Sequence, residues 1–472
     1  MKTSLKGPAG GVRNLLCWSL GVAALAGSGR AQSLDHVLIA WNDLGMHCAN
    51  QDFSTLVVLP PYNNVKAQLL RRQFGGPPLL VTQNVRLEYS IPGNTTSITK
   101  TNFWDYAQQI FGLPSPLPPD IGLTGNGLSG VMAPHAGYFE VTGVPITPFP
   151  DNDLTHEHPY QLLHVDAYDA TTNLLLAQTD TVIPVSNEIT CVSAGCHASE
   201  QDILDQHPDE AGFNPNARPI LCASCHASPA LGTQGIPEAG YFSWRIHEKH
   251  HDMQPQDGMS TCYRCHPGAQ TQCLRDVMST NPANPMICQD CHGTMQEVAT
   301  SIENGRIPWL NEPSCGTCHG AAFAEEPGQL FRNSRGHGGL YCSACHGSPH
   351  AILPSREAGD NLQNIRLQGH AGTLSDCRVC HTTRPQGAGP HGIAAPPYDE
   401  VVLEIQRQNT GQGLRLTWNS LAGASEYRVY RLAEPWSGEG LLLLGSTALT
   451  EWQLPEPEGA RREFFRVTAL MP

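Results

Sequence analysis

The pattern of hydrophobic and polar positions changes three times along the chain. A basic start and an apolar run from Leu15 to Ala26 come first. Residues 32–186 then carry short apolar or alternating runs, separated by Pro, Gly, Asn and Asp. Residues 187–392 are rich in Gly, Pro, His and Asn, and residues 397–472 return to alternation at period two. The pattern predicts a multidomain protein whose first and last folded units are rich in β-strands.

Residues 32–186 are expected to form a β-rich N-terminal domain with a β-sandwich-like shape. The runs that predict strands are 34–41, 79–89, 137–144, 162–168 and 174–185. Residues 102–111 are different, because the aromatic side chains of Phe103, Trp104 and Tyr106 crowd one short segment. That segment predicts a short helix packed on the sheets.

Residues 397–472 are expected to form a separate C-terminal β-unit. Strands are predicted at 414–418, 427–431, 441–444 and 463–469, where apolar and polar residues alternate. The spacing from Trp418 to Tyr427, followed by a late strand, resembles fibronectin type III domains. The unit is short for that fold, so its first strand is expected either to be trimmed or to begin near Tyr398. The resemblance implies a β-sandwich that spaces domains or presents surfaces.

The N-terminus is typical of a secretory signal peptide. Lys2, Lys6 and Arg13 precede the apolar run, and Gly29-Arg30-Ala31 gives a small-residue exit. We expect residues 1–31 to be removed on export, to the periplasm, the outer cell surface or the medium. No later stretch approaches the ~20 apolar residues of a membrane span, so no transmembrane segment is expected.

Charge narrows the choice of partners. The whole chain carries a formal charge of −15. Residues 1–31 contain four of the 28 basic residues and none of the 43 acidic ones, so the mature chain is more acidic still. Such a surface repels phosphate, so no nucleic acid partner is expected. Basic redox partner proteins, divalent cations or plain solubility fit better.

The central region repeats one motif seven times. Six copies read C-x-x-C-H and the first reads C-x-x-x-x-C-H. In order, the motifs are Cys191/Cys196/His197, Cys222/Cys225/His226, Cys262/Cys265/His266, Cys288/Cys291/His292, Cys315/Cys318/His319, Cys342/Cys345/His346 and Cys377/Cys380/His381. C-x-x-C-H is the attachment signature of c-type haem, in which both thiols form thioethers and the histidine is the proximal iron ligand. The sequence predicts seven haem c groups in a heptahaem cytochrome c domain, residues 187–392.

Two other uses of paired cysteines explain the motifs less well. Structural zinc needs two pairs for each metal ion, so seven pairs leave one over, and zinc does not require a histidine after every second cysteine. Disulfides do not require that histidine either. The wider first motif is read as haem by the same inference. Because the segments between motifs are short and polar, the porphyrins are expected to supply the apolar interior and folding is expected to depend on them.

Whether each iron has a second axial ligand distinguishes an electron carrier from an enzyme. His47 is one candidate for this second ligand. Eight others lie in the central region: His207, His247, His250, His251, His337, His350, His370 and His391. Two histidines saturate the iron, which favours electron transfer over substrate binding. On a helix, His247, His250 and His251 would serve two or three haems. Between His266 and His337 lie only His292 and His319, so the haems of the fourth and fifth motifs must take ligands from remote sequence.

Cys48 and Cys273 are the cysteines of the mature chain outside the motifs. Free thiols are rare in oxidising compartments, so these two are expected to form a disulfide that ties the N-terminal domain to the haem region. Cys48 follows Met46 and His47, and either of these is read as a haem ligand or contact, or as part of a buried strand end.

Several segments together carry a family resemblance. These are Gly45-Met46-His47-Cys48, Lys100-Thr101-Asn102-Phe103-Trp104-Asp105-Tyr106-Ala107, Val144-Pro145-Ile146-Thr147-Pro148, and Cys273-Leu274-Arg275 after the third motif. With the C-x-x-C-H array, they resemble a group of exported bacterial multihaem c-type cytochromes over about residues 35–390. The resemblance implies electron transfer outside the cytoplasm and names no partner or reaction.

Three functions follow from the sequence. The favoured one is an electron carrier, not an enzyme, that passes electrons between periplasmic and extracellular redox partners. The second is an oxidoreductase acting on a small nitrogen or sulfur oxyanion at one haem with an open site. His197, in the irregular motif, is the first candidate for that haem. The third is a subunit that self-associates into a haem-stacked filament.

Overall fold

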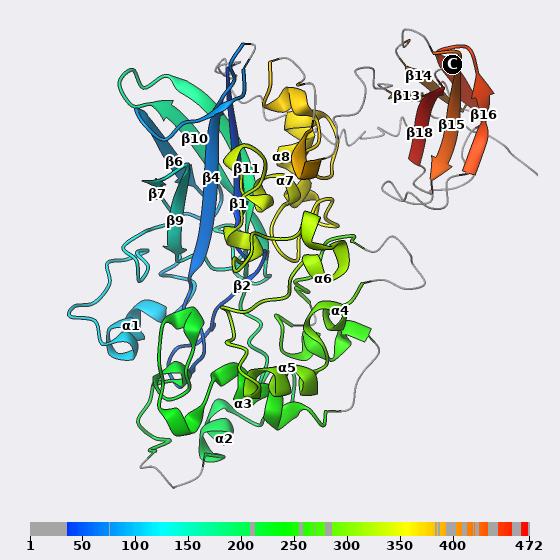
Figure 1. The fold of residues 1–472 in the computed structure, drawn as a ribbon. Coiled ribbons are helices and arrows are strands. Elements are labelled where there is room, and N and C mark those ends of the chain that lie inside the picture. The colour runs from blue at the N-terminus through cyan, green and yellow to red at the C-terminus, as the bar shows by residue number, and fades with distance from the viewer. Residues whose placement is uncertain are drawn as a thin grey trace, which may run out of the picture.

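The structure is a computed structural model. It describes residues 35–74, 76–207, 213–253, 258–268, 270–278, 286–382, 385, 388–392, 403–407, 413–418, 420, 424–432, 442–455 and 464–470. The protein is multidomain, with N-terminal β-sheets, a central cysteine-rich region of short helices, and small antiparallel sheets near the C-terminus (Figure 1). This agrees with the coarse organisation that the hydrophobic pattern predicts.

Two five-stranded sheets make up most of the N-terminal part. The first has the order β1 (His36–Asn42), β4 (Asn63–Arg71), β9 (Tyr138–Val144) and β8 (Ala133–His135), with β5 (Leu79–Leu80) also paired to β4. The second has the order β2 (His47–Cys48), β11 (Leu175–Ser186), β10 (Tyr160–Asp169), β6 (Val85–Ser90) and β7 (Ser129–Val131). The short β3 (Leu56–Val57) pairs with β12 (Ile220–Leu221) of the central region.

One hydrophobic cluster draws side chains from both sheets. Leu69 and Phe139 enter it from the first sheet, and Leu163 and Ile183 enter it from the second. Alternate residues of each strand point into this core, because successive side chains of a strand face opposite ways. The strands predicted from alternation are confirmed as β1, β5 with β6, β9, β10 and β11.

The predicted helix is also confirmed, as α1 (Phe103–Phe111). Phe103 lies edge-on to Phe53 at 5.1 Å between ring centroids, within a separate aromatic cluster. Gly112 ends the helix with φ 60°, a left-handed conformation that favours glycine.

Strand β1 is buried on both faces. Leu38 and Ala40 point into the core between the sheets, whereas Val37, Ile39 and Trp41 pack against residues of the central region. Their partners there include Leu340, Tyr341, Ala344 and Val379. The apolar core under the sixth and seventh motifs is therefore supplied partly by the N-terminal sheet.

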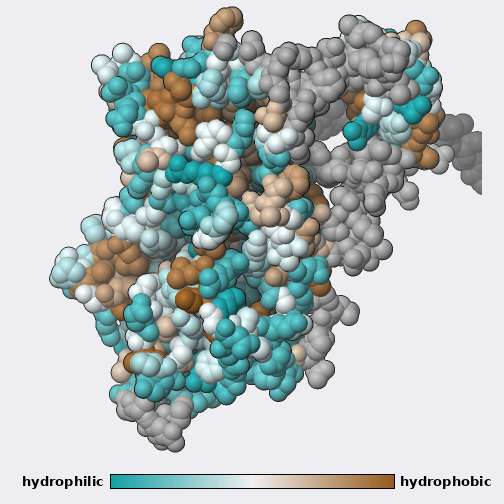
Figure 2. All heavy atoms as spheres, in the orientation of Figure 1, coloured by the Kyte–Doolittle hydropathy of each residue, from teal (hydrophilic) through white to brown (hydrophobic). Residues whose placement is uncertain are grey.

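The central region is built of short helices. Its α-helices are α2 (Glu200–Asp205), α3 (Phe242–His250), α4 (Cys288–His292), α5 (Met295–Glu303), α6 (Gly316–His319), α7 (Cys342–His346) and α8 (Ala358–Gln368). α5 has a capping box, in which Thr294 and Glu297 each bond the other's backbone N–H. Hydrophilic residues prevail on the face around α3, α4 and α5 (Figure 2).

The C-terminal part contains two three-stranded antiparallel sheets. The first has the order β13 (Leu403–Arg407), β14 (Leu414–Trp418) and β17 (Glu451–Leu454); the second has the order β16 (Leu442–Thr447), β15 (Glu426–Leu432) and β18 (Phe464–Leu470). Leu416, Trp418, Tyr427 and Val429 form their buried core. Residues 1–34 lie outside the described part of the chain. Among the described residues, no helix has the length and apolarity needed to cross a membrane.

Candidate functional site

Six of the seven cysteine–histidine motifs form one tight turn, and the wider first motif closes a larger one. The motifs at Cys288–His292 and Cys342–His346 are the one-turn helices α4 and α7. In the other five, the histidine N–H donates to the carbonyl of the first cysteine at 2.8–3.0 Å: His197 to Cys191, His226 to Cys222, His266 to Cys262, His319 to Cys315 and His381 to Cys377. This bond also forms in the wider first motif, which supports reading it with the others.

A second histidine ring lies opposite the histidine of six motifs. The distances between ring centroids are 6.2 Å for His197 and His250, 6.3 Å for His226 and His207, 5.9 Å for His266 and His247, 6.1 Å for His292 and His350, 5.9 Å for His346 and His391, and 6.1 Å for His381 and His337. Segments up to 58 residues apart in sequence are thus brought together, as His292 and His350 show.

These separations fit a metal ion held between two imidazoles. Two metal–nitrogen bonds of about 2 Å, each extended by roughly 1 Å from nitrogen to ring centre, span roughly 6 Å. Aromatic rings without a metal also pack at this separation, as Phe103 and Phe111 do at 6.3 Å, so the argument depends on the pairing of motif histidines with other histidines and not on distance alone. The chain's own residues therefore fit a haem iron with two histidine ligands at six of the seven motifs.

The second histidines are oriented through their other ring nitrogen. His247 Nδ1 donates to the Ser243 carbonyl and His250 Nδ1 to the Ile246 carbonyl, both at 2.7 Å. Because a carbonyl only accepts, these bonds place the proton on Nδ1 and leave Nε2 able to bind a metal. Desolvation lowers the pKa of His247, and it lowers that of His350 to about 4, so both rings are neutral as ligation requires.

Helix α3 serves two motifs at once. His247 faces His266 of the third motif, and His250, one turn later, faces His197 of the first. Phe242, at the start of the same helix, lies 6.1 Å from the His226 ring of the second motif. The prediction that this histidine cluster addresses two or three sites is consistent with this geometry.

Three other candidate ligands lie elsewhere. His47 Nε2 is bonded to Asp43 at 2.7 Å, in a buried pair. His370 Nδ1 donates to the neighbouring Ala371 carbonyl, and His251 Nδ1 donates to Glu248. Among the described residues, none of these three rings lies opposite a motif histidine. His197, expected to be the exception among the seven, has His250 opposite it instead.

Cysteines of different motifs also lie next to one another. The thiols of Cys262 and Cys288 are hydrogen-bonded, which joins the third and fourth motifs. Other pairs lie close enough for one thiol to raise the pKa of its neighbour, after the larger effect of desolvation. They are Cys191 with Cys222, Cys191 with Cys265, Cys318 with Cys291, Cys342 with Cys315, and Cys380 with Cys345. These electrostatic interactions, with the Cys262–Cys288 hydrogen bond, connect every motif to at least one other.

The second cysteines of the first two motifs, Cys196 and Cys225, differ in their surroundings. Cys196 is exposed, yet it lies near enough to Cys265 of the third motif to contribute to the raised pKa of that thiol, after desolvation and Cys191. Cys225 is half-buried, with its Sγ 3.8 Å from the Ser224 hydroxyl. Neither cysteine is in a disulfide among the described residues. The thioether bonds predicted at Cys196 and Cys225 stay a prediction.

Cys48 and Cys273 are neighbours as well. Burial raises the pKa of the Cys48 thiol to about 12, and Cys273 is the next largest cause. Both thiols are free in the structure. The disulfide between them is not formed there and stays a prediction.

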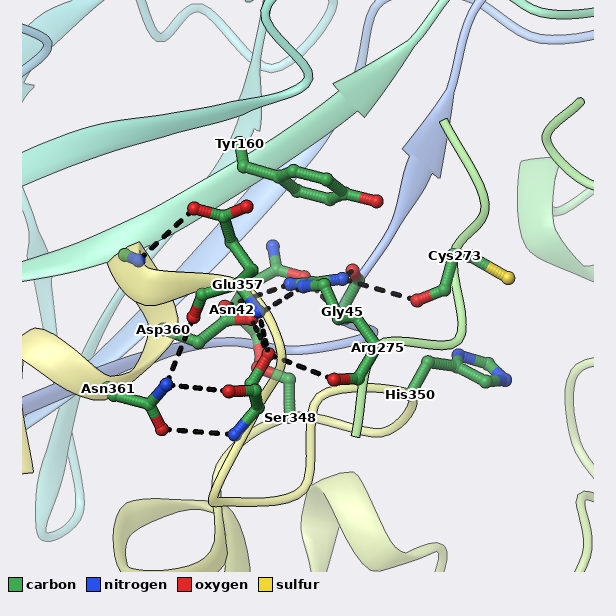
Figure 3. Close-up of polar contacts among 12 residues, drawn as sticks. Asn42, Gly45, Tyr160, Cys273, Arg275, Ser348, His350, Glu357, Asp360 and Asn361 are labelled. Atoms are coloured by element: carbon green, nitrogen blue, oxygen red, sulfur yellow. Dashed lines mark hydrogen bonds and ion pairs between the residues drawn. The ribbon is translucent and has the colours of Figure 1, made fainter. Parts of the chain in front are cut away.

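A buried polar cluster around Arg275 joins the N-terminal part to the site (Figure 3). The guanidinium bonds both carboxylate oxygens of Asp360, at 2.6 and 3.0 Å, and donates to the Gly45 carbonyl. It also stacks on the Tyr160 ring, 4.6 Å from its centroid. Arg275 is 5% exposed, so these contacts are made away from water.

His350 is placed by the same cluster. Its φ is 64°, and its Nδ1 lies 3.3 Å from the Leu44 carbonyl. The backbone N–H groups of Arg275 and Asp276 both donate to the His350 carbonyl. Ser348 donates to the Asn42 carbonyl at 2.6 Å. Segments from both parts therefore hold the ring that faces His292.

Sequence reasoning did not single out Arg275, Asp360 or Ser348 as part of the site. The run Cys273-Leu274-Arg275 was a visible signal, but nothing in it indicates a buried ion pair with a residue 85 positions later.

Comparison with known protein families, curated proteins and solved structures gives no match.

Proposed function

We propose that the chain is an exported heptahaem c-type cytochrome that transfers electrons between redox partner proteins. The observation that carries the proposal is the set of six histidine pairs at 5.9–6.3 Å, each made of one motif histidine and one histidine from outside the motifs. Neither zinc nor disulfide chemistry requires that pairing.

Haem iron, when bound, supplies one-electron redox chemistry. The fourteen motif cysteines would hold the porphyrins as thioethers, and the paired histidines would hold six of the seven irons on both sides. The hydrogen bonds at Nδ1 fix the rings so that little moves when the charge changes. Such rigidity suits electron transfer.

The neighbouring cysteines support one order for the electron path. Linking motifs that share close thiols gives second, first, third, fourth, fifth, sixth and seventh. Helix α3 independently supports the links from the second motif to the first and from the first to the third. Its side chains contact the histidines of all three motifs. In this proposal electrons enter and leave through the second and seventh motifs.

The remaining parts fit this role. The two N-terminal sheets would be a β-sandwich that buttresses the haem region, and the C-terminal sheets a fibronectin type III-like module. The leader-like residues 1–31 and the resemblance to exported multihaem cytochromes support a site of action in the periplasm or beyond it. The acidic composition favours basic redox partners.

Mass and haem content of the exported protein test the proposal. The intact mass should exceed that of the processed polypeptide by seven haem groups, and a pyridine haemochrome assay should give seven haems per chain. Replacing Cys262 and Cys265 by alanine should remove one haem, whereas Cys48→Ala, outside the motifs, should remove none. A colourless protein with the mass of bare polypeptide would refute the proposal.

A further inference from the structure

The fifth motif differs from the other six. All 21 histidines of the chain are among the described residues. Within that set, His319 has no histidine ring opposite it at the separation the other six share. His346 is close enough to His319 for the two charges to interact, but its own ring faces His391 at 5.9 Å. His346, which interacts with His319, therefore already faces another histidine.

Two described histidines of the central region, His251 and His370, face no motif histidine and are held by their own segments. His251 ends α3 and lies 3.3 Å from Asp252. His370 follows α8, with its ring bonded to Ala371 at 2.8 Å. In the described part of the chain, neither has a ring contact with His319.

A cavity of about 430 Å³ lies beside this motif. Ser314 and Gly316, on either side of Cys315, line it, as do Ala324 and the carboxylates of Glu312, Glu325 and Glu326. Its volume falls within the range of small-molecule sites. Gly316 contributes to the space, because a Cβ there would approach Ala324 Cβ to 2.8 Å.

We propose, on the basis of the function proposed above, that the haem iron bound by His319 keeps one axial position for a small uncharged ligand that enters through this cavity. The site combines an unpaired motif histidine with an adjoining cavity, and the other six motifs have a histidine in the corresponding place.

The carboxylates around the cavity select the ligand's charge. Glu325 accepts a hydrogen bond from the Ser314 hydroxyl and another from the Cys315 N–H, both at 2.8 Å. Burial raises the pKa of Glu325, but these and further bonds outweigh it and hold that pKa below its ordinary value. With Glu325 ionised, and Glu312 and Glu326 beside it, an oxyanion is repelled from the cavity. A neutral nitrogen or carbon donor is not.

The site would lie within the electron path and not at its end. Cys318 interacts electrostatically with Cys291 of the fourth motif, and Cys315 with Cys342 of the sixth. Phe323, just after the fifth motif, lies 5.4 Å from the His391 ring that faces His346. A ligand at this iron could therefore exchange electrons with the haems on both sides.

Spectroscopy and ligand titration of the full-length, haem-loaded protein test the inference. Electron paramagnetic resonance of the oxidised protein should give one high-spin ferric haem in seven, and the reduced protein should bind one carbon monoxide per chain. Imidazole should convert the high-spin signal to low-spin, whereas nitrite, an oxyanion, should do so at least about tenfold less effectively.

Two variants separate the cavity from the rest of the molecule. Ala324→Trp, which fills the cavity, should weaken imidazole binding by about tenfold or more. Ala322→Trp, two residues earlier and not part of the lining, should leave it unchanged. Glu312→Gln removes one negative charge from the cavity lining and should reduce the difference in binding between imidazole and nitrite.

The possible failures are distinguishable. Seven haems that are all low-spin and bind no carbon monoxide would overturn the inference while the electron-transfer proposal stands. Equal binding of imidazole by both tryptophan variants would show that ligands do not enter here, and would also overturn it. A haem count of zero would refute the proposed function itself.

Discussion

His247 and His250 show how the residue scale sets the ligands. They lie one turn apart on α3, and each donates its Nδ1 proton to the carbonyl four residues earlier. The same helix geometry gives both rings the same tautomer, yet they face the histidines of different motifs. Ligand choice therefore depends on where each ring points, not on its chemistry.

His250→Ala tests this distinction. The change removes the ring opposite His197 while sparing the helix, because alanine is the best helix former. We expect one additional high-spin haem in the electron paramagnetic resonance spectrum, and one more carbon monoxide bound per reduced chain. The haem count should stay at seven, because the thioethers are untouched.

His251→Ala is the matched control. The Nδ1 of this neighbour also donates to a backbone carbonyl, that of Glu248, but no motif histidine lies opposite its ring among the described residues. Its spectrum should equal that of the unaltered protein. If His251→Ala opened a haem and His250→Ala did not, the assignment of ligands on α3 would be wrong.

The motif residues could be predicted from sequence and the pairing could not. A cysteine pair followed by histidine is a local signal, readable at Cys288 or Cys342 without knowledge of the fold. The partner of His292 is His350, 58 positions later, and its approach depends on Leu44 and Arg275, which belong to two other segments of the chain. His197 was singled out by its motif spacing, but the spacing of two cysteines carries no information about which residue faces the motif histidine.

At the scale of elements, the loop around Gly45 and the segment around Arg275 clamp two parts of the protein together. Gly45 has φ 78°, and a Cβ at this position would collide with the Pro349 carbonyl. The chain can approach so closely only because glycine stands there. Arg275 then bonds the Gly45 carbonyl and Asp360 at once.

Arg275→Met should break this clamp. It leaves the Asp360 carboxylate buried without its partner, and loss of one member of a buried ion pair typically destabilises a protein by about 3–5 kcal/mol. We expect a lower thermal midpoint, and a partial change of the His292 site to high-spin because His350 loses its support. Differential scanning calorimetry and electron paramagnetic resonance measure the two effects.

Arg378→Met is the comparison for that variant. Its partner Asp376 lies at 2.9 Å, but the arginine side chain is 64% exposed. Exposed pairs contribute about 0–1 kcal/mol, so the thermal midpoint should barely move. Equal decreases of the thermal midpoint in the two variants would mean that burial does not make the Arg275 ion pair more important for stability than the exposed one.

Some elements followed from the hydrophobic pattern and others, β4 among them, did not. α1 and most long strands were predicted because their apolar residues recur at helix or strand period. β4 was missed because Lys66 and Gln68 interrupt its apolar positions, although both are buried. Gln68 bonds the backbone of Gly137, Gly339 and Tyr341, so the central region satisfies a polar group that sequence alone places in water.

At the scale of the whole molecule, the central region depends on what surrounds it. The larger apolar clusters of the described chain belong to the N-terminal sheets, to α1, to the C-terminal sheets, and to the boundary between β1 and α7. The motif segments between residues 191 and 319 add few buried apolar side chains of their own. Porphyrins would supply that missing interior, which agrees with the expectation that this region folds with its haems.

Net charge gives the last prediction, on the rate of electron exchange with partners. A chain with 43 acidic and 28 basic residues attracts basic proteins at long range, and salt screens that attraction. In stopped-flow mixing, reduction by a small basic electron-carrier protein should slow by about tenfold or more from low ionic strength to about 0.15 M. Reduction by an uncharged small-molecule donor should not change, because it is not steered. A basic carrier whose rate ignored salt, or an acidic carrier that reacted as fast at low salt, would mean that the acidic surface does not select the partner.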